Sequence, residues 1–263
     1  MLQGNTEGKA NDMYSYFKSE ALKMRHTFAE RLIIIAPMFT ILLALLIMPG
    51  MYFQVECYNW FYSLILPGMI SLGCTLVTTK DQKMKNMGVI SLPINLKKVW
   101  IAKILVCMVM TFIACFLLFL GTSAIGAITN YKNAVRIPML NGFLGVIVLV
   151  VTFMWQIPIC MFIGSKLGML PTLLINVGAY SVFAIMAATE SYWWIVPYSI
   201  PSRLMCPILK ILPNGLPAVE ESFTYKPELL SSSVVLPGVT ITIILFLILT
   251  VITAKWYKGQ EAK

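Results

Sequence analysis

The chain of 263 residues is 59% hydrophobic and only 12% charged, with a formal net charge of +9. Soluble domains carry about 25% charged and about 45–50% apolar residues, so one globular core cannot hold this apolar excess. The single histidine, His26, excludes sites built from several histidine ligands. Neither a G-x-x-x-x-G-K-[ST] nor a G-x-G-x-x-G motif occurs, which argues against a nucleotide site in this chain. We predict an all-α integral membrane protein that works within a larger assembly.

The N-terminal region, residues 1–31, is expected to be cytoplasmic and to contain an amphipathic helix. Apolar residues recur at helical spacing over Asp12–Thr27, basic residues occupy the other faces, and Asp12 is the predicted N-cap. Such a helix would lie in the inner membrane interface, although a simple anchor that orients the first span would share this pattern. The first residues are polar, so we expect no cleaved signal peptide.

A transmembrane domain over residues 32–254 is expected to contain six helices, followed by a cytoplasmic tail over 255–263. Each apolar run is close to the ~20 residues that cross ~30 Å of hydrocarbon. None contains Asp, Glu, Lys, Arg or His, and backbone groups in lipid must be satisfied within the segment, which favours helices. The predicted spans are Leu32–Gly50, Tyr58–Thr79, Ile104–Gly126, Leu140–Gly164, Met169–Thr189 and Val234–Ala254.

The distribution of charge predicts the orientation. Fifteen of the twenty basic residues fall on the side that holds both termini, and the two sides have net charges of +9 and 0. Lys and Arg near span ends mark the cytoplasmic side, so both termini are predicted to be cytoplasmic. Topology explains the basic excess without nucleic acid, which is not an expected partner.

Two segments outside the spans are longer and more structured than connections require. The inner loop Lys80–Trp100 is predicted to form a short basic helix that displays methionines, to break at Pro93 and to start a new helix at Asn95. It is either a solvated basic loop or a docking surface, and the methionines favour the latter. The outer stretch Glu190–Ser233 is rich in Trp, Tyr and Pro, and its apolar part, Leu204–Leu212, is too short to cross a bilayer. We therefore predict an outer re-entrant or interfacial pair of short helices broken by proline.

The six cysteines form no C-x-x-C pair and are interpreted as packing residues. Cys57 and Cys206 both fall toward the outer face, so a disulfide between them is a minor alternative. The spans offer no ionisable group for a coupling ion and no base beside a serine nucleophile. The energy for any transport would therefore come from another subunit.

The chain resembles a permease of the type 2 ABC exporters in its six spans, N-terminal interfacial helix, long second inner loop and apolar outer stretch. Two segments are similar to lantibiotic-immunity permeases. The first runs from Ser19-Glu20-Ala21-Leu22-Lys23-Met24-Arg25-His26-Thr27-Phe28 to Arg31-Leu32-Ile33-Ile34-Ile35-Ala36-Pro37. The second runs from Tyr198-Ser199 through Arg203-Leu204-Met205-Cys206-Pro207 to Leu212-Pro213-Asn214-Gly215.

The resemblance implies an E-type permease subunit in the cell membrane of a Gram-positive bacterium. Its implied partners are two copies of an ABC ATPase, which would bind ATP and magnesium, a second related permease, membrane lipid, and a lantibiotic peptide that is cleared from the membrane. No cofactor is implied in this chain. The implied ATPase-coupling residues are Lys83, Met84, Met87, Leu92, Pro93 and Asn95. The implied substrate-facing residues are Trp193, Trp194, Tyr198, Arg203, Asn214 and Gly215.

Two alternatives stay open on the sequence. The same architecture would serve another drug, a lipid or a polysaccharide, because apolar helices carry little information about cargo. A non-transporting sensor subunit, signalling through a kinase without an ATPase, is the alternative from another class. An enzyme is the least favoured reading, since no catalytic constellation is recognisable.

Overall fold

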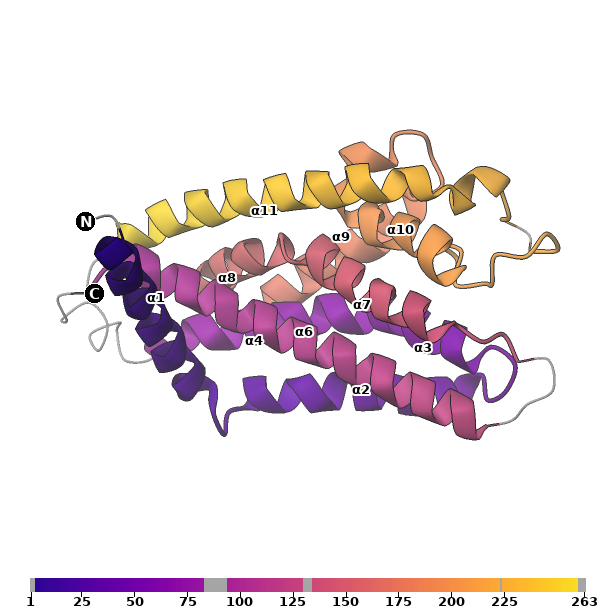
Figure 1. Cartoon of the computed structure of the whole chain (residues 1–263), viewed down its shortest axis with the longest axis horizontal. Coiled ribbons are helices and arrows are strands. Elements are labelled where there is room, and N and C mark those ends of the chain that lie inside the picture. The colour runs from indigo at the N-terminus through magenta and orange to yellow at the C-terminus, as the bar shows by residue number, and fades with distance from the viewer. Residues whose placement is uncertain (1–2, 83–93, 130–133, 223, 260–263) are drawn as a thin grey trace.

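The computed structural model describes residues 3–82, 94–129, 134–222 and 224–259. Over these residues the chain forms a bundle of long helices that run along one axis, and the two termini lie at the same end (Figure 1). No strand is present in the described part of the chain, where the one β-type pairing is an isolated bridge between Ile211 and Pro217. The predicted all-α architecture is confirmed.

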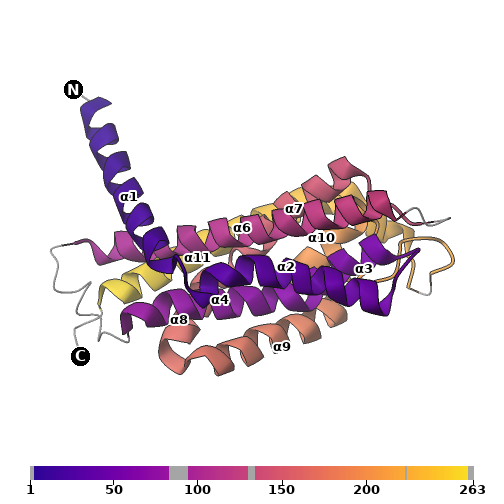
Figure 2. The ribbon, with the colours of Figure 1, turned by 90° about the horizontal axis from the view of Figure 1, so that it is seen from below.

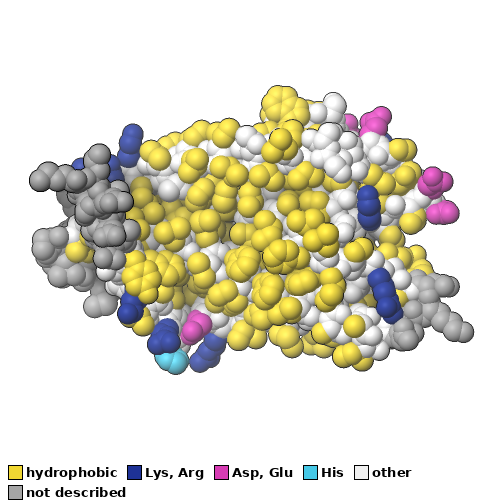
Figure 3. Space-filling view, in the orientation of Figure 1, with side chains coloured by type: hydrophobic (Ala, Val, Ile, Leu, Met, Phe, Trp, Pro, Cys, Tyr) yellow, Lys and Arg dark blue, Asp and Glu magenta, His cyan; other side chains and the backbone are white. Residues whose placement is uncertain are grey.

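Five described helical stretches are long and apolar enough to cross a membrane, or six if one bent pair counts as a single span. Each overlaps one predicted span. They are α2 (Phe28–Ile47), α3 (Phe53–Trp60) continuing into α4 (Leu66–Gln82), α6 (Leu96–Ile128), α9 (Met169–Ala187), α11 (Val235–Lys258), and the pair α7 (Met139–Phe153) and α8 (Gln156–Leu167). Apolar side chains cover the middle of the face seen in Figure 3, and charged side chains gather at its two ends.

The N-terminal helix α1 (Gln3–Met24) leaves the bundle at an angle (Figure 2). The predicted N-cap at Asp12 is wrong, because the helix begins nine residues earlier and Asp12 lies in its interior. The chain then turns at His26, whose φ of 59° is left-handed. The Thr27 hydroxyl caps α2 by accepting a hydrogen bond from the backbone N–H of Glu30.

Two prolines interrupt the spans. Pro67 has no N–H to donate to the preceding turn, and the residues just before it, Phe61–Ile65, form a π-helical turn between α3 and α4. Pro158 lies in the first turn of α8, and α7 and α8 meet there at an angle of 46°. The sequence predicts the span but not this bend.

The outer stretch folds back into the bundle. Two 3-10 turns, Trp193–Ile195 and Pro197–Ser199, lead into α10 (Ile200–Leu209), which packs mainly against α7. The predicted pair of short helices broken by proline is wrong: α10 begins at Ile200 and runs through Pro207 without a break, after two 3-10 turns. Pro201 is compatible with the first turn of α10, because the first N–H groups of a helix have no partner within the helix and proline has no N–H. All of α10 except Ile208 is buried.

Candidate functional site

The inner loop is framed by two described residues, Gln82 and Ile94. Of the six residues implied in ATPase coupling, Lys83, Met84, Met87, Leu92 and Pro93 lie outside the described part of the chain. The sixth, Asn95, is the N-cap of α6, and its Oδ1 accepts hydrogen bonds from the backbone N–H groups of Lys97 (3.1 Å) and Lys98 (3.4 Å). The predicted helix start at Asn95 is therefore confirmed.

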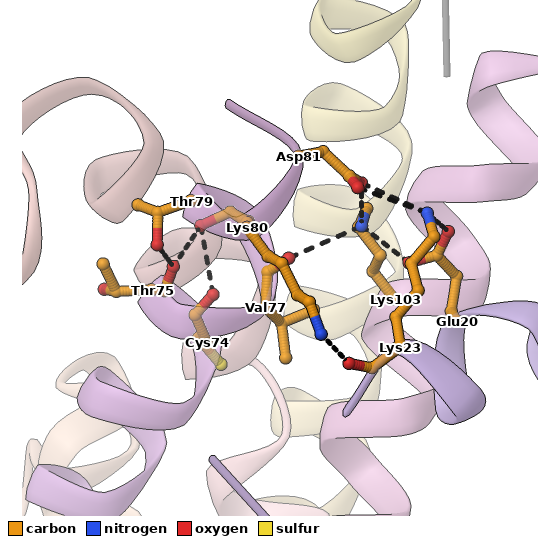
Figure 4. Close-up of polar contacts among 10 residues, drawn as sticks. Glu20, Lys23, Cys74, Thr75, Val77, Thr79, Lys80, Asp81 and Lys103 are labelled. Atoms are coloured by element: carbon orange, nitrogen blue, oxygen red, sulfur yellow. Dashed lines mark hydrogen bonds and ion pairs between the residues drawn. The ribbon is translucent and has the colours of Figure 1, made fainter. Parts of the chain in front are cut away.

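Four charged side chains meet beside this loop and form the inner ion cluster: Glu20, Lys23, Asp81 and Lys103 (Figure 4). Nζ of Lys103 lies 2.7 Å from Oε2 of Glu20 and 2.6 Å from Oδ2 of Asp81. Nζ of Lys23 lies 2.7 Å from Oε1 of Glu20 and 3.3 Å from Oδ1 of Asp81. The two cations and two anions alternate, so the cluster has no formal net charge.

Burial makes Lys103 the central member of the inner ion cluster. Its side chain is 1% exposed, whereas that of Lys23 is 30% exposed. The carbonyl oxygen of Val77 lies 3.5 Å from Nζ of Lys103, so together with the two carboxylates all three N–H donors of the ammonium have an acceptor. A buried ion that loses its partner costs several kcal/mol, which makes this arrangement sensitive to the loss of any one charge.

The inner ion cluster connects three elements around the loop. Glu20 and Lys23 come from α1, Asp81 from the end of α4 just before the loop, and Lys103 from the second turn of α6 just after it. Lys80 adds a hydrogen bond from its ammonium to the backbone carbonyl of Lys23. The N-terminal helix is thus attached to both sides of the loop.

A second contact joins α1 to the beginning of α6. The backbone N–H of Asn95 donates to the Tyr16 hydroxyl at 3.2 Å. Nζ of Lys98 lies 5.9 Å from the centroid of the Tyr16 ring, within the range of a cation–π interaction. Tyr16 and Lys23 therefore hold α1 against the loop at two positions along the helix.

The beginning of α6 is also fixed to the far side of the bundle. The buried Trp100 stacks on Tyr257 at 4.6 Å between ring centroids and donates its indole N–H to the Thr253 hydroxyl at 3.0 Å. Trp256 packs edge-on against Phe162 of α8, with ring centroids 4.7 Å apart. These contacts join the beginning of α6 to α11, and α11 to α8.

The inner ion cluster was not predicted from the sequence. Lys103 and Asp81 lie just outside the predicted spans and Glu20 lies in the predicted interfacial helix, and all three were counted as topology charges. The available signal was an opposite pair, Asp81 and Lys103, placed at the two ends of one inner loop. Whether these two side chains face each other and Glu20 depends on how each helix is rotated about its axis. The lengths of the apolar runs do not determine that rotation.

The residues implied to face substrate are divided between interior and surface. Trp194 is 52% exposed and Asn214 is also exposed. Arg203 is buried, with its two terminal N–H groups donating to the carbonyls of Leu229 (2.7 Å) and Glu228 (2.9 Å). Arg203 therefore ties α10 to the chain that precedes α11.

Three further residues of this set have structural contacts. Trp193 is buried, and the guanidinium carbon of Arg203 lies 6.0 Å from its ring centroid. Gly215 has a φ of 88°, and a side chain there would come within 2.4 Å of Asn59, so only glycine fits. Tyr198 is half-buried and donates its hydroxyl proton to Oδ1 of Asn176 at 3.1 Å. Burial raises the pKa of Tyr198, so its hydroxyl remains a donor.

Tyr198 joins a buried polar node that also includes Ser71, Gln156 and Asn176. The Asn176 amide donates to the Ser71 hydroxyl (3.0 Å) and to Oε1 of Gln156 (3.0 Å). The node connects α4, α8 and α9 with the outer segment through uncharged groups. The polar node was not predicted, because only ionisable residues within the spans were considered as candidate functional groups, and Gln and Asn are not ionisable.

The described residues contain no cluster of three or more His, Cys, Asp or Glu that could hold a metal ion. Cys57 and Cys206 are both buried and free, so the alternative disulfide is not formed. Burial raises the pKa of Cys206 to about 12. Comparisons with protein-family models, with curated proteins and with solved structures gave no match.

Proposed function

We propose that the chain is an E-type permease subunit of a type 2 ABC exporter that removes a lantibiotic from the cell membrane and so confers immunity or resistance. In this proposal the protein spans the membrane six times with both termini in the cytoplasm. The resemblance of Ser19–Phe28 and Tyr198–Gly215 to immunity permeases supports the family and the cargo.

The single observation that carries the transport mechanism is the attachment of α1 to both sides of the inner loop. An ATPase that docks on this loop would push against a segment held by the inner ion cluster and by Tyr16. The packing of Trp100 on α11 would then pass the movement into the spans. No ATP site is required in this chain, because the partner supplies the energy.

The outer segment is the proposed site of peptide contact. Trp194 and Ile195 are 52% and 60% exposed, and both lie in the 3-10 turn that follows the end of α9. Lantibiotics are amphiphilic peptides, so an exposed aromatic and aliphatic pair at the outer interface suits extraction from the outer leaflet. The buried polar node would link this segment to α4, which ends at the inner loop.

The test is to purify the tagged chain from its native operon in mild detergent, identify what accompanies it and measure ATP turnover. We expect an ABC ATPase and a second six-span permease. A chain that purifies alone, or with a kinase, would reject the exporter proposal and favour the sensor alternative.

A second test addresses the docking surface. Replacing both loop methionines, Met84→Asp and Met87→Asp, should weaken ATPase binding because it places charge on an adaptable apolar contact. Yield and chromatographic behaviour of the permease should not change, because the proposal gives these residues a role only in contact with the ATPase. Recovery of the complete complex at normal yield would show that the ATPase docks elsewhere.

A further inference from the structure

We propose that an anionic phospholipid of the inner leaflet binds along the seam between α2 and α4, with an acyl chain in an apolar groove against α9 and its phosphate beside Lys80. This inference rests on the membrane placement proposed above but not on the ATPase, the second permease or the peptide. It assigns a ligand to the apolar groove, for which the transport proposal has no role, and to Lys80, which also contacts α1.

The apolar groove has a volume of about 540 Å³ and is formed by α2, α4 and α9. This volume falls within the range of ~300–1,000 Å³ that is typical of small-molecule sites. Every lining residue is apolar or glycine, including Phe39, Leu72 and Leu174. Such a surface suits a hydrocarbon chain and offers nothing to a polar ligand.

A glycine on α9 keeps the groove open. A Cβ atom added at Gly178 would meet no other atom within 4 Å, so the space beside this residue is empty. A side chain at this position would therefore begin in open space beside the groove that Gly178 lines. This gives a variant that fills the groove while leaving the helix packing intact.

A second pocket, the inner pocket, of about 320 Å³, lies at the inner end of the same seam; its lining is still mostly apolar but also includes Thr27, Thr79 and Lys80. Leu76 lines this pocket and Leu72 lines the apolar groove. They are four residues apart on α4, about one helical turn or ~5.4 Å. The two spaces therefore lie next to each other along α4, and the inner pocket adds two hydroxyl groups and an ammonium to an apolar lining.

The inner pocket favours an anion because of Lys80. Of the acids at this end, Glu20 and Asp81 are paired with Lys23 and Lys103 in the inner ion cluster, and Glu30 accepts a hydrogen bond from the backbone N–H of His26. Lys80 instead donates to a backbone carbonyl, which leaves its charge for a ligand, and its side chain is exposed. A phospholipid phosphate joined to an acyl chain matches this order of groups along the seam.

The test is native mass spectrometry of the purified, delipidated chain titrated separately with phosphatidylglycerol and with phosphatidylcholine. Lys80→Gln should weaken phosphatidylglycerol binding about fivefold, since one basic residue near an anionic surface contributes about that much, and should leave phosphatidylcholine binding unchanged. Gly178→Leu should weaken binding of both lipids. The matched controls are Lys258→Gln, an exposed lysine at the same end, and Ala124→Leu, an exposed small residue on α6.

Several outcomes would overturn the inference. One is that Lys80→Gln and Gly178→Leu bind phosphatidylglycerol as well as the two controls do. Another is a dimer of the chain that carries no lipid and dissociates in Gly178→Leu, which would assign the groove to a protein partner. Release of the chain from membranes by an alkaline wash would overturn both this inference and the membrane placement. With the chain in the membrane, failure of the lipid test leaves the exporter proposal standing.

Discussion

Replacing Lys103 by methionine tests whether the inner ion cluster holds α1, α4 and α6 together. Methionine has a similar length and no charge, so the substitution removes an ammonium whose nitrogen lies 2.7 Å from Glu20 and 2.6 Å from Asp81. The two carboxylates are then left with Lys23 alone. Lys23→Met is the matched control, because it removes the same charge from the more exposed part of the cluster.

The expected cost follows from burial. Breaking a buried ion pair costs about 3–5 kcal/mol, and the lower end applies here because Lys23 still contacts both acids. A loss of ~3 kcal/mol lowers the melting temperature of a chain of this size by roughly 6–12 °C. Water can replace the half-exposed ammonium of Lys23, so its removal should cost ~1 kcal/mol or less, roughly 2–4 °C.

The assay is thermal unfolding of the purified chain in detergent, followed by tryptophan fluorescence. The double variant Lys103→Met with Asp81→Asn should recover about half of the loss, because it removes one of the carboxylates left without a buried partner. Equal melting temperatures for Lys103→Met and Lys23→Met would refute the reasoning. So would a double variant that is less stable than Lys103→Met alone.

Three further predictions concern other parts of the chain. Asn95→Ala should lower stability by ~1 kcal/mol through loss of the α6 N-cap, whereas Asn95→Ser should preserve it, as measured by the same unfolding assay. Trp194→Ala should lower survival in lantibiotic without lowering stability, whereas Trp193→Ala should lower stability because the Trp193 side chain is buried. Identical effects of the two variants on survival and on stability would contradict these separate roles. At pH 8 a membrane-impermeant maleimide should label a cysteine introduced by Trp194→Cys but should not label Cys206. The pKa of Cys206, about 12 against the ordinary 9.0, lowers the fraction of reactive thiolate roughly a thousandfold. Rapid labelling of Cys206 would show that α10 is not buried.

The long apolar helices were predictable because their signal is local. A run of about twenty apolar residues has the length that crosses a bilayer, and each of the six predicted ranges overlaps a helix or a bent helix pair. Their ends differ by several residues: α6 begins at Leu96, eight residues before the predicted span, because Asn95 provides a cap and the basic residues after it are compatible with a helix.

The contacts between helices were not predictable in the same way. The inner ion cluster requires the correct rotation of three helices, and the polar node requires that Asn176 and Gln156 face each other from two spans. The buried role of Arg203 is likewise set by the carbonyls of Leu229 and Glu228, which are 25 or more residues away in sequence. Sequence patterns of one helix contain no information about such partners.

The inner ion cluster also constrains the order in which the chain assembles during synthesis. Glu20 emerges from the ribosome 83 residues before Lys103, whereas Asp81 precedes Lys103 by only 22 residues. The contacts between α4 and α6 can therefore form as soon as α6 has been synthesised, whereas the main packing of α1 is against α6 and cannot form before then. A nascent chain arrested before Lys103 would leave Glu20 without its buried partner and α1 attached to α4 only through Lys23 and Lys80. Docking of α1 thus marks the point at which the first half of the protein has been completed.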